Sequence, residues 1–206
     1  MTVASQAGAD TRRPRTLLIA CGALAREVLD LIHREGWDHM ELTCLPAKWH
    51  MTPGKIPGGV RDKIRAAKTT HDKIYVLYAD CGTAGDLDRV LEEEGVERLP
   101  GPHCYATFMG QKAFADHAGD DPTAFYLTDF LVRHFDRLVI EGLGIDRHPE
   151  LSDIYFGNYT RIVYVAQTED PALQDKARHI AERLGLAYDY RPAGYGELET
   201  FLQNAD

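Results

Sequence analysis

Residues 16–36 read TLLIACGALAREVLDLIHREG and contain one complete strand-to-helix unit. The first six residues form an uninterrupted apolar run, which is typical of a strand buried on both faces. Apolar residues then recur at helical spacing until Gly36, a residue type that commonly ends a helix. We therefore expect a strand over 16–21 and a helix from Gly22 to about Glu35.

The same alternation of strand and helix continues through the chain. Further strands are expected over 41–45, 73–79, 96–99, 124–127, 161–166 and 187–190. Helices are expected over 60–68, 86–94, 105–117, 129–141, near 149–156, over 171–184 and from 197 onward. Such alternation predicts an α/β protein with a Rossmann-like doubly wound parallel sheet. Residues 46–59, PAKWHMTPGKIPGG, are expected to be a long, shaped loop because prolines and glycines disfavour regular structure.

Composition shifts divide the chain into three parts. Residues 1–15 are polar and are expected to be a disordered lead-in. Residues 16–118 are expected to form an N-terminal α/β lobe that carries the cysteine site, and residues 124–206 a C-terminal α/β lobe. At 206 residues the chain could be one large domain or two small lobes that share a core.

The charge balance limits the partners of this protein. A formal net charge of −9 argues against nucleic acid, which requires a basic face. No apolar run approaches the roughly 20 residues of a membrane helix, and the N-terminal stretch lacks the apolar core of a secretory signal. We expect a cytoplasmic protein with a small-molecule substrate. In that compartment the four cysteines favour metal ligands, reactive groups or core residues over disulfides.

Three cysteines follow hydrophobic stretches at the points where strands are expected to end. They are Cys21, Cys81 and Cys104, separated by about sixty and then about twenty residues. The carboxyl ends of strands in a doubly wound sheet meet at one edge, where ligands bind. Three thiols could therefore meet there around one metal ion or one substrate.

The surroundings of Cys81 favour a functional thiol. Asp80 precedes it, Gly82 frees the backbone, and Thr83 with Asp86 can cap the following helix. A thiolate at a helix N-terminus is stabilised by free N–H groups, which lowers its pKa. The alternative is a small buried residue that ends a strand.

The other cysteines differ in their surroundings. Neighbours in an extended chain point in opposite directions, so of the pair His103–Cys104 we expect Cys104 to be the ligand. His103 and Asp80 are then expected to support the ligands or the substrate through hydrogen bonds. Cys21 is either a ligand or a small core residue, and Cys44, inside a strand, is expected to be core.

His50 lies in the proline-rich segment at the same expected sheet edge. It could be a metal ligand, a general base or a solvated surface residue. The aromatic turn that holds Tyr155, Phe156 and Tyr159 could line a pocket or pack between helices. The remaining histidines are expected at the surface: 33, 39, 71, 117, 134, 148 and 179.

Three thiolates and one imidazole suit a tetrahedral zinc ion, or an iron–sulfur cluster with one iron left open. The set proposed from the sequence is Cys21, Cys81, Cys104 and His50. No CxxC pair is present, and GxGxxG, P-loop and GxSxG motifs are absent as well. The metal prediction therefore depends on residues converging in space.

Several stretches together resemble a family of uncharacterised, cysteine-containing α/β proteins of methanogens and methylotrophic bacteria, often encoded beside corrinoid-dependent methyltransferases. They are LLIACGAL, the loop with His50 and Pro53, LYADCG, GPHCY, FYLTDF and IYFGNYTRIVYV, spread over about 16–203. The resemblance implies that Cys21, His50, Cys81 and Cys104 form the polar site. An acidic residue often follows HCY in that family, and this chain has Ala106 there.

The residues and the resemblance together lead to one expectation and two rivals. The expectation is a metal-dependent transferase in which zinc lowers the pKa of a thiol for methyl transfer, in partnership with a corrinoid methyltransferase system. The first rival is an iron–sulfur accessory or electron-transfer protein. The second is a non-catalytic module that binds a small molecule or a corrinoid, although no DxHxxG corrinoid loop is present.

Overall fold

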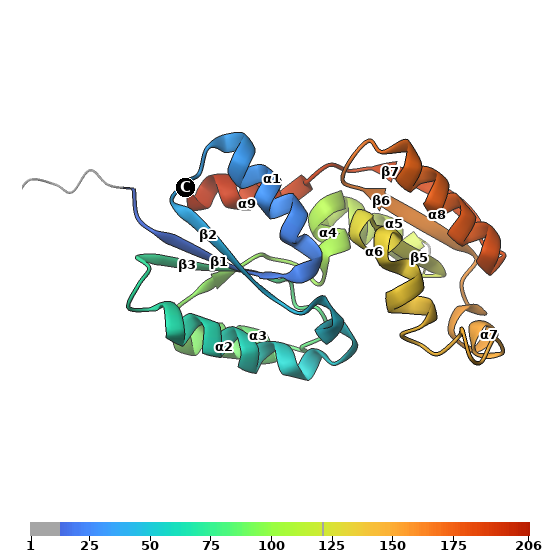
Figure 1. Cartoon of the computed structure of the whole chain (residues 1–206), viewed down its shortest axis with the longest axis horizontal. Helices are drawn as coiled ribbons and strands as arrows, with labels where there is room; N and C mark the ends of the chain where they lie inside the picture. The colour runs from blue at the N-terminus through green and yellow to red at the C-terminus, as the bar shows by residue number, and fades with distance from the viewer. Residues whose placement is uncertain (1–12, 121) are drawn as a thin grey trace, which may run out of the picture.

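The computed structural model describes residues 13–120 and 122–206 of the chain. It contains two parallel β-sheets set side by side, each covered by helices on both faces (Figure 1). The predicted α/β class and the parallel, Rossmann-like architecture are confirmed. Within the described residues, no helix has the combination of length and apolarity that crossing a bilayer requires.

The first sheet has the strand order β2-β1-β3-β4. Its strands are β1 Thr16–Cys21, β2 Met40–Leu45, β3 Lys73–Leu77 and β4 Glu97–Arg98. Every residue of β1 is buried, which explains its uninterrupted apolar sequence. Ile19 pairs with Thr43 on one side and Val76 on the other, so β1 lies at the centre of the sheet.

Helices on the two faces of this sheet make the fold doubly wound. Helix α1, Ala25–Glu35, and helix α9, Gly196–Ala205, lie on one face, and α2, Ile56–Ala67, with α3, Asp86–Glu94, lies on the other (Figure 1). The chain leaves β1 toward β2 and then crosses to β3 on the opposite side. The carboxyl ends of β1 and β3 therefore flank the topological switch point, the usual ligand position in such sheets.

The second sheet has the order β5-β6-β7. Its strands are β5 Ala124–Thr128, β6 Arg161–Ala166 and β7 Ala187–Pro192. Helices α6 Asp129–Phe135 and α8 Pro171–Leu184 cover one face, with the short α7 Leu151–Phe156 beyond them. Helices α4 Cys104–Met109 and α5 Gln111–Asp120 pack on the other face (Figure 1).

Side chains of β6 alternate between two hydrophobic cores, as the strand period of two requires. Ile162 and Tyr164 join the core under α6 and α8, whereas Val163 and Val165 belong to the core of the first sheet. The two halves are therefore packed together through α4. Their carboxyl edges face each other across the middle of the molecule (Figure 1).

The C-terminal helix α9 returns to the first sheet after β7. Leu198 and Leu202 are fully buried in the core that surrounds β1. The ammonium group of Lys73 donates to the carbonyl oxygen of Ala205, and Arg34 of α1 pairs with Glu199. The chain thus crosses between the two halves twice, once before β5 and once after β7.

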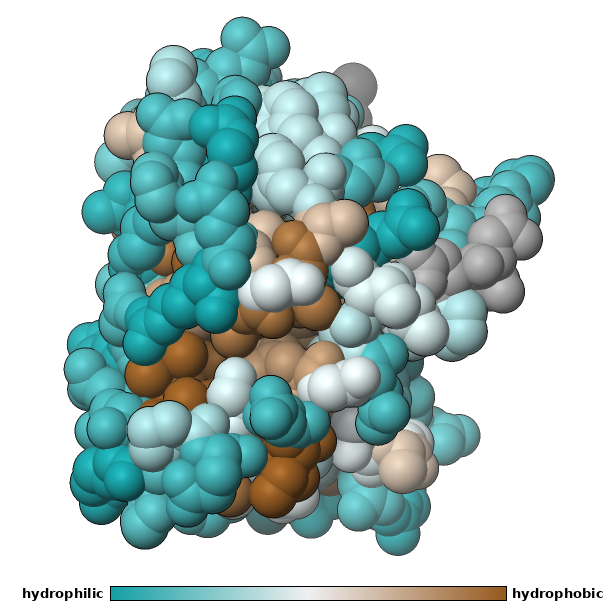
Figure 2. Space-filling model, turned by 90° about the vertical axis from the view of Figure 1, so that its right-hand side faces the viewer, coloured by the Kyte–Doolittle hydropathy of each residue, from teal (hydrophilic) through white to brown (hydrophobic). Residues whose placement is uncertain are grey.

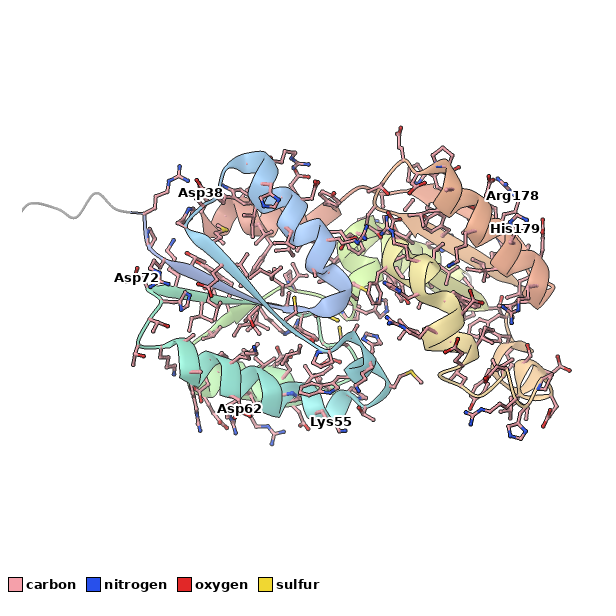
Figure 3. The ribbon with its side chains drawn as sticks, viewed as in Figure 1. Asp38, Lys55, Asp62, Asp72, Arg178 and His179 are labelled. Atoms are coloured by element: carbon pink, nitrogen blue, oxygen red, sulfur yellow. The ribbon has the colours of Figure 1, made fainter. Side chains whose placement is uncertain are left out.

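The N-terminal end of the described chain is fixed to the first sheet. The amide of Arg15 donates to a carboxylate oxygen of Asp72 at 2.8 Å, and the amide of Asp72 donates back to the Arg15 carbonyl at the same distance. Asp72 and Asp38 lie at the amino edge of this sheet, far from the second half (Figure 3). Most of the lead-in expected over 1–15 lies outside the described residues.

The expectation of a long loop over residues 46–59 is wrong. Residues 46–59 contain two short 3-10 helices, Ala47–Met51 and Pro53–Lys55, and the first turn of α2. Pro57 is accepted because it lies in the first turn, where the missing N–H has no helical partner. Gly59 is needed for packing, since a Cβ there would come within 2.4 Å of the Trp49 ring.

Two expected helices are interrupted. The helix expected over 105–117 divides into α4 and α5 at Gly110, whose φ of +84° suits glycine. The helix expected over 129–141 is kinked at His134 and continues as a π-helix, Asp136–Ile140. The π-helix supplies Arg137, Leu138 and Val139 to the cavities described below.

The end of the molecule that carries α7 and α8 exposes hydrophobic residues in a hollow bordered by hydrophilic ones (Figure 2). Among the described residues with exposed apolar side chains, Ile154 and Tyr155 belong to α7, with exposed fractions of 69% and 43%. Helix α7 therefore buries Phe156 in the second core and leaves Ile154 and Tyr155 exposed.

Candidate functional site

A cavity of about 340 Å³ lies beside the edge strand β5, between that strand and the carboxyl edge of the first sheet. We call it the inner cavity. Its walls are mostly apolar and aromatic, and its two thiols, its imidazole and its ammonium group come from the first half. The lining includes Cys21, Ala23, Ala47, Lys48, His50, Met51, Cys104, Tyr105, Phe125, Thr128, Phe130, Leu131, Leu138, Val139, Leu143, Tyr155, Phe156 and Tyr159.

The thiols of Cys21, Cys81 and Cys104 are neighbours. The charge of Cys21 acts on the pKa of Cys81, and both act on that of Cys104. Cys21 and Cys104 line the inner cavity directly, whereas Cys81 lies behind them. The structure thus brings the three predicted thiols to the carboxyl edge of the first sheet, as the strand order requires.

Burial raises the pKa of all three thiols above the usual value. For Cys21, burial outweighs the hydrogen bond that its sulfur accepts from the Ala23 amide at 3.5 Å. For Cys81, burial and then the nearby Cys21 raise the pKa to about 12. For Cys104, burial is again the largest cause, followed by the other two thiols. All three are therefore neutral at pH 7 while no cation is close.

The expectation of a lowered pKa at Cys81 is wrong. Cys81 precedes the first residue of α3, Asp86, by a turn, and Gly85 occupies the N-cap position without a capping side chain. The thiol is therefore not held against free N–H groups of the helix. Burial dominates its ionisation instead.

Asp80 fixes the turn that contains Cys81. Its carboxylate accepts hydrogen bonds from the Thr83 hydroxyl at 2.8 Å and from the Gly85 amide at 3.1 Å, with longer contacts to Gly82 and Ala84. Burial acts to raise the pKa of Asp80, but these bonds together hold it below its usual value. Asp80 therefore shapes the backbone around the thiol.

Cys81 has a backbone conformation that L-residues seldom adopt. Its φ is +49°, in the left-handed region, and Ala84 in the same turn has +53°. Such conformations cost roughly 1–2 kcal/mol for residues other than glycine and cluster at functional sites. The turn around Cys81 is therefore maintained against local strain.

Tyr78 is a member of the site that sequence reasoning missed. It follows β3, is 2% exposed, and its hydroxyl makes no well-formed hydrogen bond within the described part of the chain. Burial raises its pKa, and the neighbouring Cys21, Cys81 and Cys44 raise it further. A buried phenol beside three thiols supplies a hydrogen-bond donor to any thiolate formed there.

His103 and Tyr105 flank Cys104 at the start of α4. The ring of His103 packs edge-on against Phe114, with centroids 4.6 Å apart, and its Nδ1 is buried without a partner among the described residues. Burial lowers the pKa of His103, and the nearby His50 lowers it further. His103 is therefore a neutral ring with one unused nitrogen, close to the second histidine of the site.

His50 lies on the short 3-10 helix Ala47–Met51 and lines the inner cavity. Much of its side chain remains accessible to solvent through that cavity, yet the surrounding protein lowers its pKa by desolvation. The structure thus brings His50 to the predicted site. The imidazole is neutral at pH 7 and can act as a ligand or as a base.

Cys44 lies in β2, paired across the ladder with Ala20, and packs against the first core. It is half-buried and does not line the inner cavity. Burial raises its pKa, followed by the charge of Cys21. Its location agrees with the structural role expected for it.

In residues 13–120 and 122–206, no three His, Cys, Asp or Glu side chains stand together in positions that could hold a metal ion. The thiols are close enough to influence each other's ionisation but are not converged on one point. Closure around an ion would require side-chain rotation about Cα–Cβ bonds.

The far wall of the inner cavity comes from the second half. Phe125 packs on Phe156 and Tyr159, with centroids 5.3 Å and 5.2 Å apart. Tyr155, Phe156 and Tyr159 therefore line the pocket as well as packing between elements. The aromatic turn at 154–159 was the sequence signal for this wall, and its pairing with β5 could not be inferred without the fold.

Comparisons with known proteins add a family but no activity. No curated protein matches the chain. The family model described as "Protein of unknown function (DUF1638)" matches residues 44–202, a stretch that includes His50, Cys81 and Cys104 and leaves out Cys21. The chain therefore belongs to the DUF1638 family of proteins of unknown function.

Proposed function

We propose that this chain is an enzyme that transfers a methyl group to or from a small molecule held in the inner cavity. Cys21, Cys81, Cys104 and His50 would hold a zinc ion at the polar end of that cavity. The observation that carries the proposal is that an otherwise apolar cavity ends at two thiols and an imidazole, with a third thiol behind them.

The donor set suits a soft cation in its chemistry. Cys21 raises the pKa of Cys81, and both raise that of Cys104, a penalty that is lost when a divalent ion replaces the protons. Sulfur with imidazole nitrogen is the ligand combination that zinc prefers. Because no three of these side chains are converged as they stand, metal binding would have to draw the thiols together.

Zinc bound at this position would lower the pKa of a substrate thiol and make it a nucleophile at neutral pH. The chain's own residues do the rest. The aromatic wall around Phe125 and Phe156 would hold the apolar part of the substrate, and the Tyr78 hydroxyl can donate to a sulfur anion. If the three thiolates alone hold the zinc ion, the fourth position is open to the substrate thiol, and the free neutral imidazole of His50 can accept the proton that this thiol releases.

The proposal extends to partners and location. The resemblance described above implies work beside a corrinoid methyltransferase system, which would supply or accept the methyl group. A cytoplasmic location would keep the thiols reduced. The shape and the aromatic lining of the inner cavity suit a small molecule as the substrate.

One observation favours a second candidate, a binding module without catalysis. The thiols are neutral in the absence of a cation, and neutral thiols are poor nucleophiles. In that case Cys21 and Cys104 would contact a ligand as small polarisable groups. The two candidates differ in whether the purified chain holds a metal ion.

Elemental analysis of anaerobically purified protein tests the metal. We expect close to one zinc per chain, and Cys81→Ser should lose it while Cys44→Ala retains it. Less than about 0.2 equivalents of any transition metal contradicts the zinc proposal and favours the binding module. Iron with visible absorption near roughly 400 nm indicates the iron–sulfur alternative instead.

A further inference from the structure

A second, larger cavity of about 720 Å³ adjoins the inner cavity. We call it the outer chamber. The two spaces share part of their walls, so the outer chamber lies next to the inner cavity. The shared lining residues are Ala47, Lys48, Met51, Phe130 and Leu138.

The outer chamber is lined by cations and by no acidic side chain. Lys48 and Lys55 come from the segment before α2, and Arg137 comes from the π-helix of the second half. Figure 3 shows Lys55 at the end of α2 that is nearer to the second half. Three positive side chains from both halves thus meet in a protein whose net charge is −9.

These cations lack the ion pairs that other basic residues have. Arg61 pairs with Glu93, and Arg183 pairs with Asp136 at 2.8 Å, so the carboxylate next to Arg137 in sequence is already engaged. Within the described part of the chain, neither Lys48, Lys55 nor Arg137 makes an ion pair or a side-chain hydrogen bond. The three positive charges that line this chamber repel each other, and a bound anion would reduce that repulsion.

The inner cavity has the opposite character. Phe125, Leu131, Val139 and Phe156 give it apolar walls, and its volume is near the lower end of the roughly 300–1,000 Å³ of small-molecule sites. Lys48 lines both spaces, so its ammonium group can reach a ligand that lies in either. A ligand that fits both spaces needs an apolar body and a negatively charged end.

We infer that the substrate is a small organic anion whose apolar body fills the inner cavity while its acidic group is held by Lys48, Lys55 and Arg137. This inference names the substrate class of the proposed function and rests on it for the reactive end of the molecule. The other end, opposite the acidic group, would then face Cys21 and Cys104. The cationic chamber would select against neutral and positively charged molecules of the same shape.

Matched ligands test the inference by isothermal titration calorimetry. The probes are octanoate and 4-phenylbutanoate, with 4-phenylbutanamide and 4-phenylbutylamine as neutral and cationic counterparts. We expect 4-phenylbutanoate to bind at least about 10-fold more tightly than the amide, with a preference that decreases as salt is added. The titrations are made on the protein as purified and again after chelation, because a bound zinc ion would itself attract a carboxylate.

Charge-removing variants then locate the anion. Lys48→Gln and Arg137→Gln should each weaken 4-phenylbutanoate binding by about 2- to 10-fold and leave amide binding unchanged. Arg178→Gln is the control, because it removes the same charge from α8 at the far end of the molecule (Figure 3). Equal binding of acid and amide, no binding of either acid, or an equal loss in the Arg178 variant overturns the inference.

The outcomes also separate this inference from the zinc proposal. Anion preference that persists after chelation supports the cationic chamber whether or not zinc is present. Zinc that is retained, together with equal binding of acid and amide, supports the metal site and overturns the substrate class.

Discussion

The amide of Cys81 donates a 2.8 Å hydrogen bond to the carbonyl oxygen of Pro102. The adjacent amide of Asp80 donates to Gly101 at 3.0 Å, so the turn after β3 and the segment before α4 form a short backbone ladder. Cys81 and Cys104 are therefore positioned by main-chain bonds that do not depend on their thiols. Replacing a thiol should leave its neighbours in place.

Cys81→Ser should lose bound metal while the fold persists, because a hydroxyl is a poor ligand for soft cations. The Pro102 hydrogen bond uses the backbone and survives the change. Metal content and circular dichroism, measured on the same sample, check this. A variant that keeps its full metal content would remove Cys81 from the proposed ligand set.

Asp80→Ala should destabilise the protein by about 1–3 kcal/mol, because one carboxylate holds the turn at Thr83 and Gly85. Urea unfolding measures the change. Asp80→Asn is the matched control, since its amide oxygen can still accept from the turn, and it should cost less. If both variants match the unaltered protein, the turn is held by the backbone ladder alone.

Alkaline pH should destabilise the metal-free protein through its thiols. The pKa of Cys81 is about 12 when folded and 9.0 without burial, so between these values only the unfolded chain releases the proton. The free energy of unfolding should therefore decrease by about 1.4 kcal/mol per pH unit from this thiol between pH 9 and 12, with no effect below pH 9.

Cys81→Ser removes this contribution, since serine does not titrate in that range, and it also removes the smaller effect of Cys81 on the pKa of Cys104. Urea unfolding at several pH values should show a shallower decrease in the variant. Identical slopes in the two proteins would mean that Cys81 titrates as an exposed thiol.

Cys44→Ala should cost only about 1 kcal/mol and leave metal content unchanged, because it removes one half-buried sulfur from β2. Thermal unfolding and elemental analysis measure the two effects. Loss of metal here, together with retention in Cys21→Ala, would show that the wrong N-terminal cysteine was assigned to the site.

His50→Ala distinguishes three roles. Loss of metal identifies a ligand, and retained metal with lost activity identifies a base that reaches the substrate. Stability should change little, because the side chain is largely exposed on a short 3-10 helix. If both metal and activity remain, His50 is only part of the cavity wall.

Much of the fold could be predicted from local signals. The bounds of β1, α3, β6 and α8 agree with expectation, because apolar periodicity is clean there and Gly95 and Gly185 end their helices in the left-handed conformation. The start of α2 was missed because Pro57 and Gly59 were interpreted as helix breakers. Proline tolerates the first helical turn, and Gly59 accommodates the Trp49 ring.

Only the part of the candidate site that the first sheet builds could be predicted from the sequence. Cys21 and Cys81 follow adjacent strands, so the parallel-sheet rule places them together. The aromatic wall and Arg137 come from the second half, and no local pattern relates them to residues 46–55. Tyr78 was missed because an apolar strand end gives no sign that its hydroxyl lies among thiols.

The return of α9 to the first half has a consequence for how the protein is made. Leu198 and Leu202 complete the core around β1, so that core stays open on one face until residues 196–205 have left the ribosome. The Arg34–Glu199 pair joins segments far apart in the sequence, and such long-range contacts form slowly during folding. Chaperone capture of nascent chains should therefore persist until α9 is synthesised.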